Sequence, residues 1–207
     1  MIKYLVNQVP PLGANCYTVY DTQTKNCLII DLGGDFYKIL KQAGDLGLRV
    51  LGVVLTHGHF DHCAGAVSCK EKNIPVYVSQ EDGKMLCSMT NMSEYFGFGR
   101  LSFTADCFLR EGKNEIGGIM LEVIKTPGHT AGSVCILIED KLFSGDTLFA
   151  LSYGRCDLPT GDFTELKNSL LNKIFTLSGE IEVLPGHGGK TTINHERKYN
   201  PINEDNY

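Results

Sequence analysis

Three of the six histidines of this chain lie within six consecutive positions. The stretch contains His57, His59, Asp61 and His62, and it directly follows an apolar run over residues 50–55. Neutral imidazoles and carboxylates are the ligands that Zn²⁺ and related divalent cations take in proteins. The apolar run predicts a buried strand, and a loop at the end of a strand can direct several side chains toward one point. We therefore predict metal ligands here, and an incidental group of histidines in a polar loop is the weaker interpretation.

Three further residues of ligand type occur in the same local context. His129, Asp146 and His187 each follow a predicted strand, and a glycine directly precedes each of them. Glycine lets the backbone turn tightly and approach another group closely. If these strands end at the same edge of a layered sheet, the side chains converge there. The seven residues together therefore predict one metal centre.

The elements that must position these residues are short and of mixed type. Apolar runs and alternating patterns predict strands over residues 2–6, 16–20, 27–31, 50–55, 75–78, 119–125, 133–139, 141–144 and 181–184. The run over 133–139 is mostly apolar, which indicates a strand covered on both faces. Strands and helices in this order predict an α/β fold in layers, with two sheets inside.

Helical patterns occur in four places. Apolar residues recur at helical spacing over 36–43, and small residues are frequent over 61–72. Asp162 and Glu165 form a capping-box pattern ahead of a third helix, and Asn194 is predicted to cap a short final helix. Residues 80–105 are apolar but irregular. Core packing is the favoured interpretation of that segment, and a substrate-facing flap is the alternative.

Length and composition indicate a single globular domain over residues 1–207. The chain is 43% hydrophobic and 21% charged, which is typical of a soluble protein. A net charge of −5 and a pI of about 5.7 argue against nucleic acid as the main ligand. No apolar stretch reaches the ~20 residues of a membrane helix, and the N-terminus lacks a signal-peptide pattern. We therefore expect a cytoplasmic protein without a membrane partner, and the oligomeric state stays open.

The eight cysteines are scattered along the chain and form no Cys-x-x-Cys pair. In a chain of this length without a secretion signal, reduced and mostly buried thiols are expected rather than a disulfide framework.

The histidine motif resembles that of a known family. The H-x-H-x-D-H run, followed by a distant histidine, an aspartate and a last histidine, is similar to the metallo-β-lactamase-fold hydrolases. The small single-domain members of the glyoxalase II-like branch, the hydroxyacylglutathione hydrolase-like proteins, match best. Residues 154–163 and 191–201 also resemble this branch. The resemblance covers nearly the whole chain and implies a four-layer αβ/βα sandwich with metals at one edge of its two sheets.

The resemblance also implies a role for each ligand. His57, His59 and His129 would hold a first metal ion. Asp61, His62 and His187 would hold a second, and Asp146 would bridge both. Two divalent ions, with Zn²⁺ preferred and Fe or Mn as alternatives, are therefore the expected cofactors.

This ligand set suggests hydrolysis. Two dications close together lower the pKa of a bridging water toward neutrality, and the resulting hydroxide can attack the carbonyl of a small-molecule thioester or ester. One cation would polarise the carbonyl and stabilise the tetrahedral oxyanion. Asp61 would be the catalytic residue that orients the nucleophile and carries a proton. A thiolate leaves readily, so no strong general acid is required.

Two departures from related branches narrow the function. Antibiotic-hydrolysing members usually carry a cysteine where Asp146 stands, which argues against β-lactam hydrolysis. Glyoxalase II itself has a C-terminal helical domain that contributes to the glutathione site, whereas only twenty residues follow His187 here. The hydrolytic centre is therefore expected to be intact, while a glutathione thioester is not assured as the substrate.

Two other functions remain open. A mononuclear Fe(II) persulfide dioxygenase of the same fold would use only His57, His129 and Asp146, the two histidines and one carboxylate of a facial triad. A metal-binding module without turnover is the third possibility, although no position of the motif is broken.

Several neighbours have an ordinary structural interpretation. His195 is expected at the surface or at a helix cap, and Cys63 is expected to be a buried thiol. Arg155 and Asp157 could orient ligands or form an ordinary ion pair. Tyr153 could line the pocket.

Overall fold

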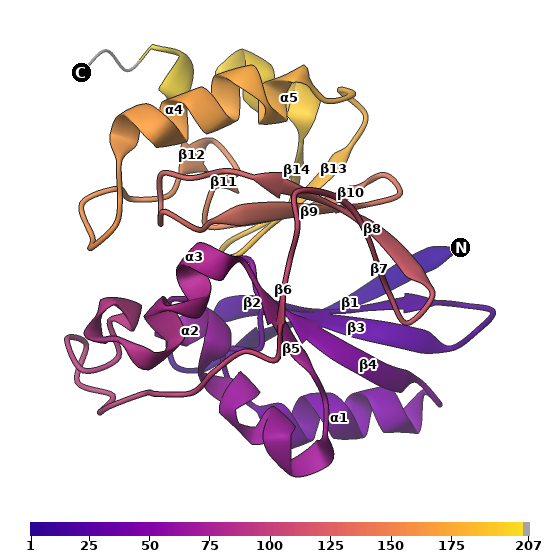
Figure 1. Cartoon of the computed structure of the whole chain (residues 1–207). Helices are drawn as coiled ribbons and strands as arrows, with labels where there is room; N and C mark the ends of the chain where they lie inside the picture. The colour runs from indigo at the N-terminus through magenta and orange to yellow at the C-terminus, as the bar shows by residue number, and fades with distance from the viewer. Residues whose placement is uncertain (205–207) are drawn as a thin grey trace.

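Two six-stranded sheets face each other in the structure, a computed structural model that describes residues 1–204 (Figure 1). The first sheet has the order β1-β2-β3-β4-β5-β6, with β1 (Ile2–Val9), β2 (Ala14–Asp21), β3 (Asn26–Ile30), β4 (Arg49–Val54), β5 (Val76–Val78) and β6 (Cys107–Phe108). Its first three strands pair antiparallel, and β3 to β6 pair parallel.

The second sheet comes from the C-terminal half of the chain. Its order is β14-β13-β10-β9-β8-β7, with β7 (Gly112–Ile116), β8 (Ile119–Lys125), β9 (Val134–Ile138), β10 (Lys141–Gly145), β13 (Glu182–Pro185) and β14 (Thr191–Thr192). Strands β10 and β13 pair parallel although 36 residues separate them, from Gly145 to Glu182. A small separate hairpin consists of β11 (Leu148–Phe149) and β12 (Ser152–Tyr153).

Helices cover the outer face of each sheet. Helix α1 (Phe36–Asp45) lies on the first sheet, and α4 (Phe163–Asn172) and α5 (Ile193–Tyr199) lie on the second (Figure 1). The apolar faces of these helices are buried against the strands in two separate core clusters. The layers therefore run helix, sheet, sheet, helix, and the predicted four-layer αβ/βα sandwich is confirmed.

A third core cluster fills the space between the two sheets. Tyr17 of β2 and Phe143 of β10 meet there edge to face, with ring centroids 5.1 Å apart. Strand β9 is buried on both faces for most of its length, as its apolar sequence predicts. Burial of apolar side chains from both sheets thus holds the two halves of the chain together.

The capping box predicted for α4 is present. The Asp162 carboxylate accepts a hydrogen bond from the backbone N–H of Glu165 at 2.9 Å, and the helix begins at Phe163. The prediction for α5 was wrong by two residues. Thr192 is the N-cap, because its hydroxyl accepts a hydrogen bond from the His195 N–H, and Asn194 lies inside the helix.

The predicted helix over 61–72 is only partly α-helical. A single turn, α2 (Phe60–Cys63), continues as a 3₁₀ helix over Ala64–Lys72. The N–H of Gly65 donates to the Gly33 carbonyl at 3.1 Å instead of bonding within the helix. A Cβ at position 65 would lie 2.9 Å from the Leu32 carbonyl oxygen. This close backbone contact explains the change of helix type, since it removes one bond of the α ladder.

The segment over 80–105 contains α3 (Gln80–Gly83) and two short 3₁₀ turns, Met85–Cys87 and Met89–Asn91. Leu86 and Met85 are buried, in agreement with core packing. Further 3₁₀ turns are Ile174–Thr176 and Pro201–Asn203. Strands β6, β11, β12 and β14 were not predicted, because two-residue strands carry no periodic signal. The five-residue strand β7 was not predicted either, since its sequence GKNEI contains a single apolar residue.

Two expectations about composition can be compared with the structure. No helix within residues 1–204 is both long and apolar enough to cross a bilayer. All eight cysteines lie in this described part as free thiols, and five of them are buried: Cys16, Cys27, Cys63, Cys69 and Cys135.

Candidate metal centre

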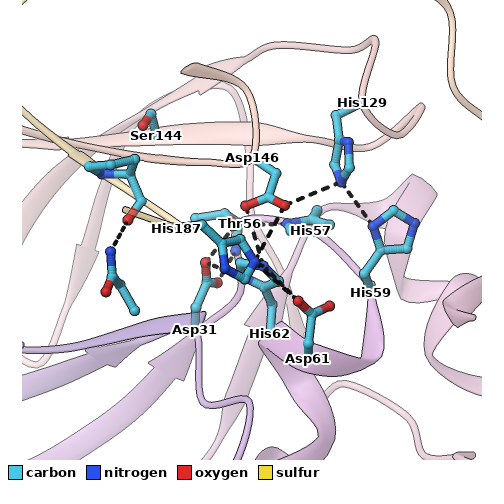
Figure 2. Close-up of polar contacts among 12 residues, drawn as sticks. Asp31, Thr56, His57, His59, Asp61, His62, His129, Ser144, Asp146 and His187 are labelled. Carbon is cyan, nitrogen blue, oxygen red and sulfur yellow. Dashed lines mark hydrogen bonds and ion pairs between the residues drawn. The ribbon is translucent and has the colours of Figure 1, made fainter. Parts of the chain in front are cut away.

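All seven predicted ligand residues meet at one edge of the two sheets (Figure 2). Four come from the loop and turn after β4, and the others follow β8, β10 and β13. Parallel pairing of β10 with β13 places the loops that carry Asp146 and His187 side by side. The sequence analysis expected ligand residues directly after strands, and we call this the strand-end rule. It brings the ligands together because these strands finish at the same edge.

His57, His59 and His129 form the first group of the centre. One ring nitrogen from each lies within 4.8 Å of the others, and all three side chains are buried. Nδ1 of His59 is 2.9 Å from Nε2 of His129. Nδ1 of His129 donates a hydrogen bond to the carbonyl of Arg155 at 2.8 Å, which leaves its Nε2 free to accept.

Asp61, His62 and His187 form the second group, with ligand atoms within the same distance. Nε2 of His187 lies 3.1 Å from Oδ2 of Asp61 and 3.2 Å from Nε2 of His62. His62 is fully buried, whereas the side chain of His187 is 30% exposed. His187 is therefore the most exposed histidine of the centre.

Asp146 lies between the two groups. Its Oδ1 is 3.3 Å from Nε2 of His62, and its Oδ2 is 3.8 Å from Nε2 of both His129 and His187. Gly186 makes this approach possible, since a Cβ there would lie only 2.2 Å from Oδ1 of Asp146. The glycine before His187 is thus required by close contact.

Asp31 belongs to the centre but was missed in the sequence. It is buried after β3, and its Oδ2 lies 3.0 Å from Nδ1 of His62. It also accepts hydrogen bonds from the backbone N–H and the hydroxyl of Thr56 at 2.8 and 2.7 Å. The strand-end rule that found Asp146 also applies to Asp31, which directly follows an apolar strand.

Asp82 is a second missed residue. Its buried carboxylate accepts hydrogen bonds from Gly58 N–H, Gly132 N–H and the Thr130 hydroxyl, at 2.8, 2.8 and 2.7 Å. Gly58 separates His57 from His59, and Thr130 follows His129. Asp82 therefore ties the two loops of the first group together. Its position inside the irregular segment over 80–105 left no sequence signal for it.

The histidines differ in their preference for a proton. Burial, reinforced by neighbouring histidines, lowers the pKa of His57 well below its ordinary value and that of His59 to about 3. Burial also opposes protonation of His62, but the carboxylates of Asp146 and Asp61 overcome it and hold its pKa well above the ordinary value. His57 and His59 are therefore neutral at pH 7, and His62 is charged.

The two carboxylates stay ionised. Burial raises the pKa of Asp146 and of Asp61, yet the neighbouring histidines outweigh that effect, with His62 first among them. The net result is a lowered pKa for Asp61 and a strongly lowered pKa for Asp146. Both groups can therefore accept a cation at neutral pH.

The remaining sequence candidates lie around the centre. Arg155 contacts His129 through its backbone, while its guanidinium pairs with Asp157 at 2.7 Å through two nitrogens on the surface. Tyr153 lines the adjoining cavity, as expected. Cys63 is buried outside the ligand groups, and burial raises the pKa of its thiol. His195 is on α5 and contacts Tyr199.

The donor set fits divalent metal ions. Nε2 of buried His57 has no hydrogen-bond partner within the described residues. The nitrogen pairs at 2.9 and 3.2 Å approach the spacing of about 3.3 Å that two imidazoles on one tetrahedral cation have, given metal–nitrogen distances of about 2.0–2.1 Å. Such an arrangement of buried nitrogen and oxygen acceptors is a metal site.

Comparison with known proteins identifies the family. The model of the metallo-beta-lactamase superfamily matches residues 9–187, which include all seven ligand candidates. The chain belongs to the metallo-β-lactamase superfamily. Among its curated relatives in that superfamily is hydroxyacylglutathione hydrolase GloC of Haemophilus influenzae. The two are 34% identical, over 91% of this chain and 92% of the relative.

Two solved structures resemble this chain over nearly its whole length. The BLEG-1 B3 metallo-beta-lactamase superimposes with a TM-score of 0.90 at 35% identity, covering 98% of this chain and 99% of its own. TTHA1623, in a di-iron-bound form, superimposes with a TM-score of 0.86 at 32% identity, covering 96% and 99%. Both proteins thus share nearly the whole architecture of this chain.

Proposed function

We propose that this chain is a dinuclear metal-dependent hydrolase of thioesters. His57, His59 and His129 would hold one divalent ion. The second group, Asp61, His62 and His187, would hold the other. Asp146 would bridge the two ions. The observation that carries the proposal is the position of Asp146, whose carboxylate lies 3.3 Å from His62 of the second group and 3.8 Å from both His129 of the first group and His187 of the second.

Two divalent cations held here would supply a hydroxide nucleophile at neutral pH and polarise the substrate carbonyl. The chain itself contributes a proton acceptor. Asp61 is ionised because its pKa is lowered, and its side chain lines the cavity at the partly exposed side of the centre. Asp61 would orient the attacking water and take up its proton. The departing thiolate needs no acid from the protein.

Zn²⁺ is the proposed metal, with iron or manganese as alternatives. Imidazole and carboxylate ligands accept all three, so the donor set does not distinguish them. The solved structure of TTHA1623 is of a di-iron-bound form, which supports two ions and keeps iron under consideration.

The thioester is proposed from the relative named hydroxyacylglutathione hydrolase, 92% of whose length this chain matches. β-Lactam hydrolysis is a second candidate, favoured by the likeness to BLEG-1, although a carboxylate stands at the bridging position here. A persulfide dioxygenase using His57, His129 and Asp146 is the remaining alternative.

One set of assays on metal-loaded protein separates these functions. Thiol release from a lactoyl thioester, ring opening of a chromogenic cephalosporin, and oxygen uptake with glutathione persulfide are measured in parallel. Thioester turnover that disappears with a chelator and returns with Zn²⁺ is expected. Oxygen uptake or β-lactam opening without thioester turnover would refute the proposal.

A further inference from the structure

A cavity of about 460 Å³ opens beside the metal centre. Its floor is formed by members of the centre, and most of its remaining surface is apolar. We call these side chains the apolar wall: Leu12, Phe60, Met92, Phe96, Phe149 and Leu158. A cavity of this size suits a small organic ligand.

The apolar wall begins at the metal centre itself. Phe60 lies between His59 and Asp61 in the chain, and the ring of Phe149 meets that of His187 edge to face at 6.3 Å. A substituent of a carbonyl group that reacts at the centre would therefore lie directly against apolar side chains.

The irregular segment over 80–105 supplies part of the wall. Phe96 stacks on Phe60 with ring centroids 5.7 Å apart, and it is 40% exposed beside the cavity. Met92 is buried, and its backbone has a left-handed φ of 70°, which is uncommon for a residue with a side chain. Held backbone conformations of this kind are concentrated at ligand sites. One part of the segment thus packs in the core, and another faces the cavity.

Charge is scarce in the cavity beyond the centre. Arg155 is the one lysine or arginine of the described residues that line it. Both Nε and a terminal nitrogen of its guanidinium are already paired with Asp157. The whole chain carries a net charge of −5, which repels anions at long range. A substrate carboxylate placed in this part of the cavity would lose hydrating water. No unpaired lysine or arginine among the described lining residues would compensate for that loss.

We infer that this cavity selects thioesters whose larger substituent is an uncharged apolar chain. The inference rests on the proposed function and gives it a substrate class. A chain of several carbons would bury its methylenes against the apolar wall. Each buried methylene should raise kcat/KM about three- to fourfold until the cavity is full.

Two series of thioesters test the inference. One lengthens the acyl group from acetyl through butanoyl to hexanoyl on N-acetylcysteamine, and the other lengthens the thiol of an acetyl thioester from ethane- to hexanethiol. In at least one series, kcat/KM should rise about three- to fourfold with each added methylene. Succinyl thioester, the charged match of the butanoyl compound, should be at least tenfold poorer. Flat profiles in both series, or equal use of succinyl and butanoyl groups, would overturn the inference.

Variants connect the selectivity to the wall. In Phe96→Ala, kcat/KM should increase less with chain length than in the parent protein. In Phe96→Leu, part of that increase should return. Met120→Ala removes an exposed apolar side chain from β8, away from the cavity, and should keep the parental slope. A parental slope in Phe96→Ala would contradict the assignment.

Binding without turnover separates the two proposals. Calorimetric titration with non-cleavable thioethers of the same chain lengths should show affinity rising with length. If affinity rises while no thioester is cleaved, the proposed function is wrong and the apolar selectivity stands. If thioesters are cleaved while neither affinity nor kcat/KM follows chain length, only the selectivity is wrong.

Discussion

Oδ2 of Asp31 lies 3.0 Å from Nδ1 of His62, and both side chains are buried. This hydrogen bond fixes the imidazole with Nδ1 toward the core and Nε2 toward Asp61, Asp146 and His187. The carboxylate makes the ring nitrogen opposite to it a better ligand, because it stabilises the proton on Nδ1. Asp31 is therefore a positioning residue for the second group of the centre.

Asp31→Asn is expected to weaken binding of the second metal ion about 10- to 100-fold, since that is the usual effect of losing such a partner. The backbone φ of Asp31 is 55°, a conformation that asparagine tolerates. Asp35→Asn is the matched control, because Asp35 has a φ of 53° and its carboxylate pairs with Lys38 on the surface. Competition with a chromophoric zinc chelator measures both variants. Equal affinities would contradict the role of Asp31.

We expect close to two divalent ions per chain in metal-loaded protein. Replacement of His62 or His187 by Ala should lower the metal content by about one ion per chain and reduce turnover, since both residues belong to the second group. Elemental analysis counts the ions, and circular dichroism checks that each variant is folded. A single ion in the parent protein, unchanged with excess Zn²⁺, would favour the mononuclear dioxygenase instead.

Asp146→Ala should reduce metal content more than loss of any single histidine. A bridging carboxylate offsets the repulsion of two close dications, which is on the order of 15 kcal/mol at 4 Å even at an effective dielectric constant near 20. Asp146→Asn keeps the shape but lacks the charge, so it should lose nearly as much metal as the alanine variant. Zinc titration decides between charge and shape. If Asp146→Asn still binds two zinc ions with the affinity of the parent protein, Asp146 is not a metal ligand.

Metal uptake should release a proton from His62. The carboxylates of Asp146 and Asp61 hold its pKa well above the ordinary value despite burial, so the metal-free protein carries that proton at pH 7. A cation at Nε2 must displace it, and affinity for the second ion should therefore fall as the pH falls. His57 and His59 contribute no proton, because burial lowers their pKa, that of His59 to about 3.

Calorimetry in two buffers of different ionisation enthalpy counts the protons released during zinc binding. The variant His62→Ala should release about one proton fewer than the parent protein per chain. Identical counts in the two proteins would show that His62 is neutral before the metal binds.

Asp82→Ala should destabilise the fold by about 3 kcal/mol, because it leaves two buried N–H groups and one hydroxyl without their acceptor. The loops of His57 and His129 should loosen together, so affinity for the first ion should also fall. Glu81→Ala is the control, since Glu81 is a neighbour with a surface ion pair to Lys125. Urea unfolding and zinc competition measure the two effects. A variant as stable as Glu81→Ala would contradict the contacts of Asp82.

The ligands could be predicted from the sequence because their signal is local. An apolar run, a glycine and a histidine or aspartate occupy a few consecutive positions at His129, Asp146 and His187. Strand geometry and glycine freedom act over that same range. Asp31 also directly follows an apolar strand, although no glycine precedes it, and including it would have found a third carboxylate that contacts His62.

Other features depend on distant backbone contacts. The change of helix type at Gly65 follows from contact with residues 32–34, and the cap of α5 by Thr192 follows from where β14 ends. Helical periodicity carries no information about either contact. The short strands escape prediction for a similar reason, since a strand of two residues exists only through its pairing partner.

The sequence by itself determined which residues could bind metal and that strands would present them. The tertiary structure alone decided that these strands end at one edge, that Asp146 faces both groups, and that Asp82 joins two loops across 24 and 48 residues of chain. It also decided that Phe96 and Met92 face the cavity. The physical reason is that strand order and loop packing arise from burial of the whole core, a property of all the apolar residues together and of no single segment.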